Sequence, residues 1–435
     1  MLSLAVVGFL GCLAMATATA DEQGAGSNGV ASGSTFGSGP EDPSNLLRSE
    51  IPARRVERES VLPVSPLKSL HDATNRAKKE LYEATNIELG LTINHLFQWL
   101  SDALPDKDDW GTTTDADFVG SWALVNRGEP TQGKAYFLVQ GRWDYGTTGP
   151  QTLGFDSLGT AGGTANTFSA YAPAFILRNL YWEQGSPEAG WAVRTGKIST
   201  DAMVGTSRWI SPNITFLPNA GTGFFSNGLP DSGLGLAGAV FFNERFKVTG
   251  IVSDANGNRF DWGDITAGDF YTSLEFAYKI APRTEKAGFS KFTIWHNDGT
   301  QDGQPINAST GNEGWGTTLK LEQEFTDDGR AIGVLRWGKS WNDSAIFKQQ
   351  VGLHFLYDNP SGPAGLKHDL IGIAGNWVDS VVAGSRDEYN LEIFYRFPLF
   401  PSLDTRLSYQ FIYHPALTRG IDSVSVLSLG FRTVF

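Results

Sequence analysis

Apolar and polar residues alternate along the chain from Ile87 to its end. The alternation is most regular in the last stretch, 424–435, which reads VSVLSLGFRTVF. There, Leu427 and Phe431 share one face, and Arg432 lies on the other. A period of two predicts an extended strand whose two faces meet different surroundings.

The same period recurs often enough to predict sixteen strands. An even number is what a single-chain bacterial barrel needs when both ends lie on one side of the membrane. The 51 glycines, 13 tryptophans and 28 phenylalanines also favour turns and aromatic-rich strands over helices. The predicted strands span residues 87–98, 118–126, 134–145, 174–184, 191–199, 234–243, 246–254, 270–280, 289–297, 315–325, 331–340, 347–358, 368–378, 387–397, 404–413 and 424–435.

The connections between these strands alternate in length. Those after odd-numbered strands are mostly long, at 99–117, 146–173, 200–233, 255–269 and 298–314. Those after even-numbered strands are mostly shorter, as at 243–245, 326–329 and 398–401. Transmembrane barrels have short periplasmic turns and longer outer loops, whereas a propeller would show a blade repeat.

The two faces of the later strands differ in polarity. In the fourteenth strand Leu391 and Ile393 oppose Glu388, Glu392 and Arg396. A basic residue that faced the bilayer midplane would cost ~2–4 kcal/mol, so the charged face must line a wet lumen. Sixteen strands enclose a lumen wide enough for an aqueous channel. The sequence therefore predicts an all-β transmembrane fold, a single antiparallel sixteen-stranded outer-membrane barrel over residues 85–435, preceded by a short N-terminal helix.

Three segments precede the predicted barrel. Residues 1–20 resemble a secretory signal peptide, with an apolar core and an Ala-x-Ala cleavage site. Residues 21–66 are rich in Gly, Ser, Pro and charge, and this composition predicts disorder. Residues 67–84 have the spacing of an amphipathic helix, with Leu67, Leu70, Thr74, Ala77 and Leu81 on one stripe. We expect this helix to lie at the periplasmic mouth; a short oligomerising coil is the alternative.

Composition excludes several classes of function. The formal net charge of −13 argues against nucleic acid, which needs a basic surface. The one cysteine, Cys12, lies in the predicted signal peptide, so we expect neither disulfides nor a cysteine-based metal site; a lipoprotein acceptor is the alternative role for Cys12. No Gly-x-Ser-x-Gly motif, phosphate-binding loop or cluster of metal ligands is present. We expect a protein that is not an enzyme and that binds no cofactor or metal.

The connection after the fifth strand, 200–233, is the best candidate for an inward-folded loop that narrows the lumen. Its competitor is 146–173. Sugar recognition in a wet pore needs planar polar groups for the hydroxyls and aromatic faces for the rings. The candidate binding or constriction residues are Arg142, Arg178, Trp182, Glu183, Arg194, Lys197, Arg208 and Trp209. General polar lining without any binding is the alternative role for each of them.

Strand parity restricts these candidates. Arg178 and Trp182 share one face of an ideal strand, and Glu183 lies on the other. Arg194 and Lys197 also fall on opposite faces, and we expect Arg194 in the lumen and Lys197 nearer the outer rim. A second set on the lumen face predicts a ladder of mixed charge that keeps the wall polar through weak pairs: Glu388, Glu392, Arg396, Arg406 and Arg432.

The acidic stretch 102–117 raises the question of a calcium or lipopolysaccharide site. It lacks the spacing of an ordered calcium loop, so we expect a solvated loop.

Two parts of the chain, 175–217 and 386–435, resemble the carbohydrate-selective porins of the OprB family. In the first part the resemblance rests on Leu180-Tyr181-Trp182-Glu183-Gln184, on Arg194 and on Gly196-Lys197-Ile198. In the second it rests on Glu392-Ile393-Phe394-Tyr395-Arg396, Gln410-Phe411-Ile412, His414-Pro415-Ala416 and the closing strand with its terminal Phe435. The resemblance implies a Gram-negative outer-membrane channel that prefers small sugars, and a last strand that the barrel assembly machinery reads.

Three functions remain open at this point: a passive carbohydrate-selective porin, a general or ion-preferring porin, and an outer-membrane anchor or interaction protein. The partners expected are small sugars and ions, outer-membrane lipid and lipopolysaccharide, the assembly machinery, and further copies of the chain in a homotrimer.

Overall fold

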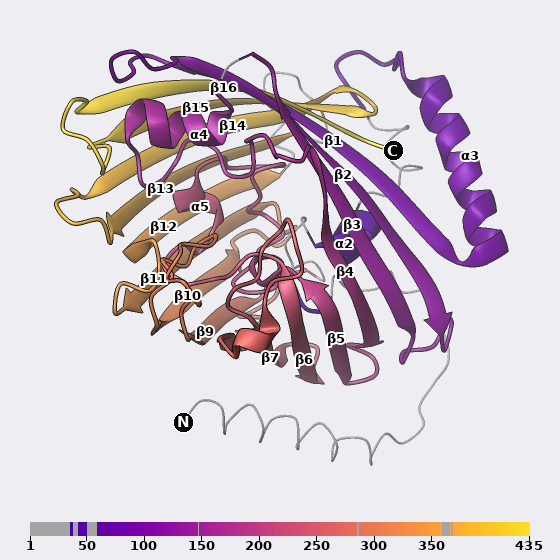
Figure 1. The fold of residues 1–435 in the computed structure, drawn as a ribbon. Coiled ribbons are helices and arrows are strands. Elements are labelled where there is room, and N and C mark those ends of the chain that lie inside the picture. The colour runs from indigo at the N-terminus through magenta and orange to yellow at the C-terminus, as the bar shows by residue number, and fades with distance from the viewer. Residues whose placement is uncertain are drawn as a thin grey trace.

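The computed structural model describes residues 35–37, 42–49, 59–146, 148–284, 287–358, 366 and 369–435. Sixteen antiparallel strands form a closed barrel, which confirms the predicted fold class and strand count (Figure 1). The strands are β1 (Ile87–Leu100), β2 (Trp110–Val125), β3 (Gly133–Asp144), β4 (Phe175–Ser186), β5 (Trp191–Ile198), β6 (Gly233–Asn243), β7 (Phe246–Asp254), β8 (Phe270–Tyr278), β9 (Ser290–Asn297), β10 (Gly314–Glu324), β11 (Ala331–Trp341), β12 (Phe347–Asp358), β13 (Leu370–Ser380), β14 (Glu388–Phe400), β15 (Leu403–Tyr413) and β16 (Ser423–Val434).

The described helices are short except for the one before β1. No described helix is both long and apolar enough to cross a bilayer. The helical segments are α2 (Pro43–Ser49), α3 (Lys68–Thr85), α4 (Pro150–Thr152), η3 (Leu153–Ser157), η4 (Thr200–Ala202), α5 (Asn219–Thr222) and η5 (Ile265–Ala267).

The first and last strands close the barrel. β1 pairs with β16 from Thr92–Val434 to Leu100–Val426. The backbone of Phe435 extends this ladder, since its N–H donates to the Leu91 carbonyl and its carbonyl accepts from the Leu91 N–H, at 2.7 and 3.0 Å. No strand edge is left open, as hydrocarbon surroundings require.

The wall alternates between exposed apolar and buried polar side chains. On β14, Leu391 and Ile393 are 47% and 44% exposed, whereas Glu388 and Glu392 are buried. On β16, Leu427 faces out and Arg432 is buried inside. The predicted face assignment of these strands is therefore correct, and charge is kept out of the lipid-facing surface.

One predicted loop boundary is wrong. Strand β2 begins at Trp110, so Asp115 and Asp117 belong to a strand and not to a solvated acidic loop. Both side chains are buried on the lumen side, where Arg142 and Gln140 of β3 bind them. Partners on a neighbouring strand hold these carboxylates in place, and a count of acidic residues along the chain does not reveal such partners.

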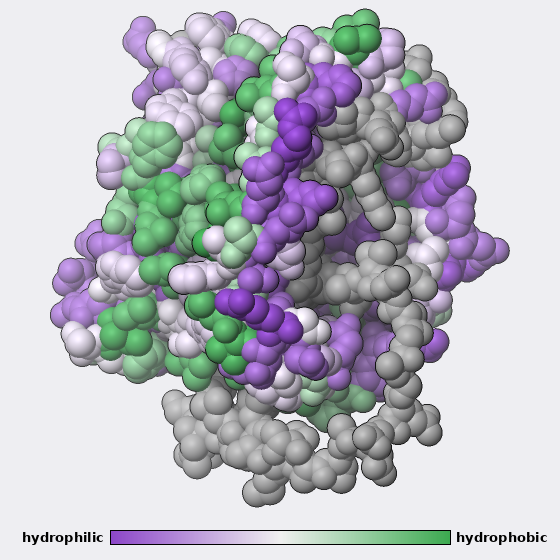
Figure 2. Space-filling view, turned by 90° about the vertical axis from the view of Figure 1, so that its right-hand side faces the viewer, coloured by the Kyte–Doolittle hydropathy of each residue, from purple (hydrophilic) through white to green (hydrophobic). Residues whose placement is uncertain are grey.

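Helix α3 lies at the short-turn end of the barrel beside the chain's C-terminus (Figure 1). Seen from its side, the helix forms a hydrophilic strip next to a hydrophobic area (Figure 2). His71 is its buried residue and stacks on Phe435, with ring centroids 4.4 Å apart. The predicted apolar stripe is not the buried face, because Leu70 is 51% exposed and the stacked ring lies about 100° further round the helix.

Parts of residues 21–66, the stretch for which composition predicts disorder, have defined positions in the structure. Residues 35–37 and 42–49, which we call the N-terminal lumen segment, lie inside the barrel with Phe36 and Asp42 fully buried. Further on, the Val61 and Leu62 N–H groups donate to the Pro398 and Leu399 carbonyls of the β14–β15 turn. This sequence cannot build a core of its own, but the barrel wall supplies the partners that it lacks. The predicted signal peptide and Cys12 lie outside the described residues.

Candidate functional site

Two long connections fold into the barrel and fill much of it. We call residues 145–174 the first lumen loop and residues 199–232 the second lumen loop; α4 and η3 belong to the first, and η4 and α5 to the second (Figure 1). The sequence left a choice between these two connections as the constriction. Both lie inside the barrel, so the structure does not choose between them.

The predicted charge ladder binds these loops. Glu388 accepts backbone N–H groups of Ala161 and Gly162 in the first lumen loop, at 2.8 and 2.9 Å, and a third from Ala416, at 2.9 Å. Glu392 accepts the Leu217 N–H of the second lumen loop, at 3.0 Å.

Two arginines of the ladder donate hydrogen bonds to backbone carbonyl groups of the second lumen loop. Arg406 donates to the Pro212 and Thr215 carbonyls, at 2.8 and 2.6 Å, and Arg396 to the Ile214 carbonyl, at 3.4 Å. Arg432 instead donates to the Asn94 side chain, at 2.8 Å. The expected role, a wall held polar by weak charge pairs, is therefore wrong for the ladder residues that hold the loops, because their partners are loop backbone groups.

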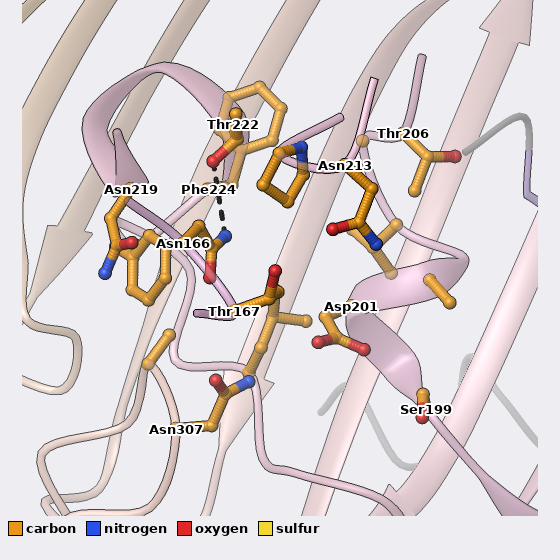
Figure 3. Close-up of a pocket in the computed structure, with 18 of the residues that line it drawn as sticks. Asn166, Thr167, Ser199, Asp201, Thr206, Asn213, Asn219, Thr222, Phe224 and Asn307 are labelled. Atoms are coloured by element: carbon orange, nitrogen blue, oxygen red, sulfur yellow. Dashed lines mark hydrogen bonds between the residues drawn. The ribbon is translucent and has the colours of Figure 1, made fainter. Parts of the chain in front are cut away.

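A cavity of about 300 Å³, lined by both polar and apolar side chains, lies between the loops and the wall (Figure 3). Its lining combines guanidinium groups, carboxylates, amides and hydroxyls with aliphatic side chains and three phenyl rings. Several of these groups point toward one another from different loops, and Asn166 of the first loop donates to Thr222 of the second, at 3.2 Å. The lining residues used below are Asp117, Gln140, Arg142, Asn166, Arg178, Asp201, Asn213, Phe224, Arg259, Asn307 and Arg336.

Arg178 reaches the cavity because β4 carries a bulge. The β3–β4 register shifts so that Leu138 pairs with Asn179 and Val139 with Leu177, which leaves Arg178 as the extra residue. Its guanidinium donates to Asp201, at 3.0 Å, and to Gln140, at 3.1 Å.

The same bulge places Arg178 and Glu183 on one face of β4, although an ideal strand would place them on opposite faces. Beyond the bulge, Glu183 lies on the buried side with Arg178, and Trp182 does not. The expectation that Arg178 and Trp182 share a face is therefore wrong, because a bulge shifts the alternation by one residue.

Arg142 lines the same cavity from β3. It is buried and pairs with Asp115, at 3.0 Å, and its guanidinium lies over the Tyr171 ring, 4.5 Å from the centroid. The Tyr171 hydroxyl donates to Gln140, at 2.8 Å. Arg142 and Arg178 are thus the two predicted site residues that line the cavity.

The other predicted residues lie elsewhere. Glu183 and Arg194 form an ion pair, at 2.6 Å, below the second lumen loop, and Arg194 is a lumen residue as expected. Lys197 donates to the Arg259 carbonyl, at 3.1 Å, in the long connection after β7. Arg208 lies over the ring of its neighbour Trp209, 4.6 Å from the centroid, and neither is among the residues that line the cavity.

Sequence reasoning missed the phenyl rings of the cavity and the cation that lies over one of them. Phe224 lies under the guanidinium of Arg336, at 4.2 Å, and Arg336 donates to the Gly221 carbonyl. Arg336 shares its strand face with Val334 and Gly338, both buried, and that alternation was a usable signal. No sequence pattern marked Phe224, since it depends on how the second lumen loop folds.

An ion pair ties a further outer connection to the cavity. Arg259, between β7 and β8, pairs with Asp231 of the second lumen loop and donates to the Tyr171 hydroxyl, at 3.1 Å. Burial raises the pKa of Asp231, but the Arg259 and Arg178 guanidinium groups offset burial and hold that pKa below its ordinary value of 3.8.

This shift predicts the acid sensitivity of the loops. A depressed carboxyl pKa in the folded state stabilises the docked loop above the ordinary pKa, and that contribution is lost as the pH falls through the folded value. We expect the change in open-channel conductance that follows loss of the Asp231–Arg259 pair to occur only below about pH 4. In Arg259→Met the change should occur at higher pH, because Asp231 loses its main cation, whereas exposed Arg245→Met should behave as wild type. An acid transition at the same pH in both variants would contradict the pairing.

In the described part of the chain, no group of three or more His, Cys, Asp or Glu side chains is arranged to hold an ion.

Comparison with known proteins gives one kind of match. No known sequence family matches the chain, and no curated protein matches it. Among solved structures, OprB of Pseudomonas putida at high pH aligns with a TM-score of 0.64 and 13% identity, over 84% of this chain and 97% of that one. The chain has the porin fold.

Other structures with the porin fold align less well. OprB of Pseudomonas putida at low pH gives a TM-score of 0.51 at 12% identity, over 87% of this chain and 99% of that one. A variant of the Rhodopseudomonas blastica porin gives 0.46 at 12% identity, over 80% and 100%. At such low identity, the porin fold is what the two OprB matches establish.

Proposed function

We propose that the chain is a Gram-negative outer-membrane porin of the OprB type that lets small sugars diffuse passively through the barrel. The observation that carries the proposal is the cavity between the two lumen loops and the wall. It offers the guanidinium groups of Arg178 and Arg336, the amides of Asn166, Asn213 and Asn307, and the Phe224 ring. Fixed donors suit sugar hydroxyls and an aromatic ring suits a sugar's apolar face, so the cavity has both parts that sugar recognition needs.

The proposed setting follows from the wall. Its apolar outer surface requires a bilayer, and its short turns would face the periplasm. Export would begin with cleavage of residues 1–20, and the assembly machinery would read the strand that ends at Phe435. Lipopolysaccharide and phospholipid would surround the barrel, and a homotrimer is the proposed assembly. Diffusion down a gradient needs no catalysis and no cofactor.

Single-channel recording with and without sugars tests the proposal. Glucose is expected to reduce the wild-type ion current, and Arg178→Ala should weaken this block about tenfold, as expected for the loss of a hydrogen bond from a charged donor. Arg178→Lys keeps the charge but not the planar fork, so it should lose sugar block while keeping ion selectivity. Exposed Arg419→Ala is the matched control, and glucose should reduce its current as much as it reduces the wild-type current.

Each alternative function predicts a different record. A general or ion-preferring porin would conduct ions, but no sugar would reduce the current. An outer-membrane anchor would give no conductance at all. The mixed charges of the cavity, where Arg178 pairs with Asp201, are the feature that would suit an ion-preferring channel.

A further inference from the structure

We propose that the N-terminal lumen segment is a displaceable plug, bound to a site on the inner wall, which restricts the pore between the cavity and the short-turn end. The proposal rests on the proposed channel function, because a plug matters only where solutes pass. Its parts are a buried ionic latch, a second attachment through a lysine, and a contact with the loop residues that line the cavity.

The latch joins α2 to β5. Arg194 donates to both carboxylate oxygens of Asp42, at 2.7 and 3.3 Å, and the two side chains are 1% and 0% exposed. Glu183 accepts from the same guanidinium, at 2.6 and 2.9 Å, and the rings of Phe36 and Tyr181 lie 5.0 and 4.2 Å from it. Four of the five N–H donors of Arg194 are therefore used by Asp42 and Glu183, and the guanidinium is buried away from a passing sugar.

A second attachment lies two strands further round the wall. The Lys247 ammonium, at the start of β7, donates to the carbonyls of Thr35 and Phe36, at 3.1 and 2.9 Å. Within the segment, Asn45 donates to the Gly37 carbonyl, at 3.1 Å, and the Ser44 N–H donates to Asp42, at 2.9 Å. Two cations of the barrel thus hold a segment whose own hydrogen bonds keep it compact.

The mode of attachment makes the segment displaceable. In the part of the chain that the structure describes, its hydrogen bonds to the barrel come from side chains and not from a strand ladder. Helix α2 has seven residues, too few to be stable by itself. If the two cations release it, the closed ladder of sixteen strands stays intact.

The segment also supports one wall of the cavity. Gly37 packs so closely against the Ala202 carbonyl that a side chain there would clash. Phe36 belongs to a buried apolar cluster with Met203, Val204 and Leu229 of the second lumen loop. Because Ala202, Val204 and Leu229 line the cavity, release of the segment would both open the space below the loop and loosen the cavity wall.

Conductance of the full chain tests the plug directly. Asp42→Asn removes one partner of the latch, and we expect a larger or more strongly fluctuating single-channel current and faster glucose uptake into proteoliposomes. Asp72→Asn is the matched control: Asp72 pairs with Lys68 on the exposed surface of α3, at 2.7 Å, and its loss should change nothing. Heat-modifiable mobility on gels verifies that each barrel is folded. Should Asp42→Asn not fold, Lys247→Met and Phe36→Ala test the other contacts of the segment.

Thiol labelling tests the displacement itself. Cys12 is the one cysteine of the chain, so a Cys12→Ser background allows a single reporter at buried Leu46. Leu46→Cys should react slowly with a charged, membrane-impermeant thiol reagent, and addition of Asp42→Asn should accelerate the reaction about 100-fold, the shift expected when a buried charge loses its partner.

The outcomes separate the plug from the channel. Faster labelling together with increased permeation supports the plug. Unchanged permeation in a folded Asp42→Asn barrel overturns it, whatever the labelling shows, while the sugar block by the cavity would remain. Absence of conductance in the wild type and in every variant would instead overturn the channel function.

Discussion

Replacing Glu388 by alanine is expected to open the pore more than any other single change to the wall. The side chain is buried and accepts three backbone N–H groups, two from the first lumen loop and one from Ala416. Its loss leaves three buried donors without an acceptor, each costing about 1–3 kcal/mol. The loop can recover its hydrogen bonds to water by leaving the wall, so we expect it to undock while the barrel stays closed.

The expected record is a single-channel conductance well above that of the wild type, with a lower unfolding temperature for the folded band on gels. Asp387→Ala is the matched control, because it removes an exposed acid next in sequence. Glu388→Gln keeps acceptor capacity and should fall between the two. If Glu388→Ala conducts like Asp387→Ala, the carboxylate does not hold the loop.

Replacing Arg406 by methionine is expected to release the second lumen loop. The guanidinium is buried and donates to two carbonyls of this loop, those of Pro212 and Thr215, which methionine cannot bind. Hydrogen bonds from a charged donor are worth about 1.5–3 kcal/mol each, and methionine retains much of the side-chain volume, so the loss falls on loop docking.

Because the second lumen loop forms more of the cavity wall, Arg406→Met should both raise conductance and weaken sugar block, whereas Glu388→Ala should mainly raise conductance. Current recordings in a glucose series separate the two effects, with exposed Arg419→Met as control. Normal sugar block in Arg406→Met would show that the loop keeps its place without this residue.

The architecture could be predicted because the bilayer imposes it on every strand. In lipid, the alternation of Leu391 and Ile393 with Glu388 and Glu392 requires the apolar side chains to face out and the carboxylates to face the lumen. The same holds for the apolar and polar residues of β16. The candidate site could be predicted only in part. Arg142 and Arg178 lie at the cavity, but Trp182 was misplaced by a single bulged residue, and Phe224 depends on the path of a loop without a repeating pattern.

The role of the ladder could not be predicted for a related reason. Sequence shows that Glu392 and Arg406 face the lumen, but their partners are backbone groups more than 170 residues away in the chain. Almost every residue has the same backbone N–H and carbonyl groups, so the sequence does not show which of them will bind a given side chain. Charge pairs between neighbouring strands were therefore what the sequence predicted. The position of the N-terminal lumen segment could not be predicted either. Its composition indicates that the isolated segment would not fold, whereas its position in the barrel depends on Arg194 and Lys247.

The stacking of His71 on Phe435 fixes an order of assembly. These rings meet only after β16 has paired with β1, because that pairing places Phe435 beside the residue that starts the ladder, Leu91. Helix α3 is synthesised before any strand, but its stacking contact through His71 can form only once Phe435 is in place. The docked helix therefore marks a finished barrel, and protease resistance of α3 should appear together with closure and not before it.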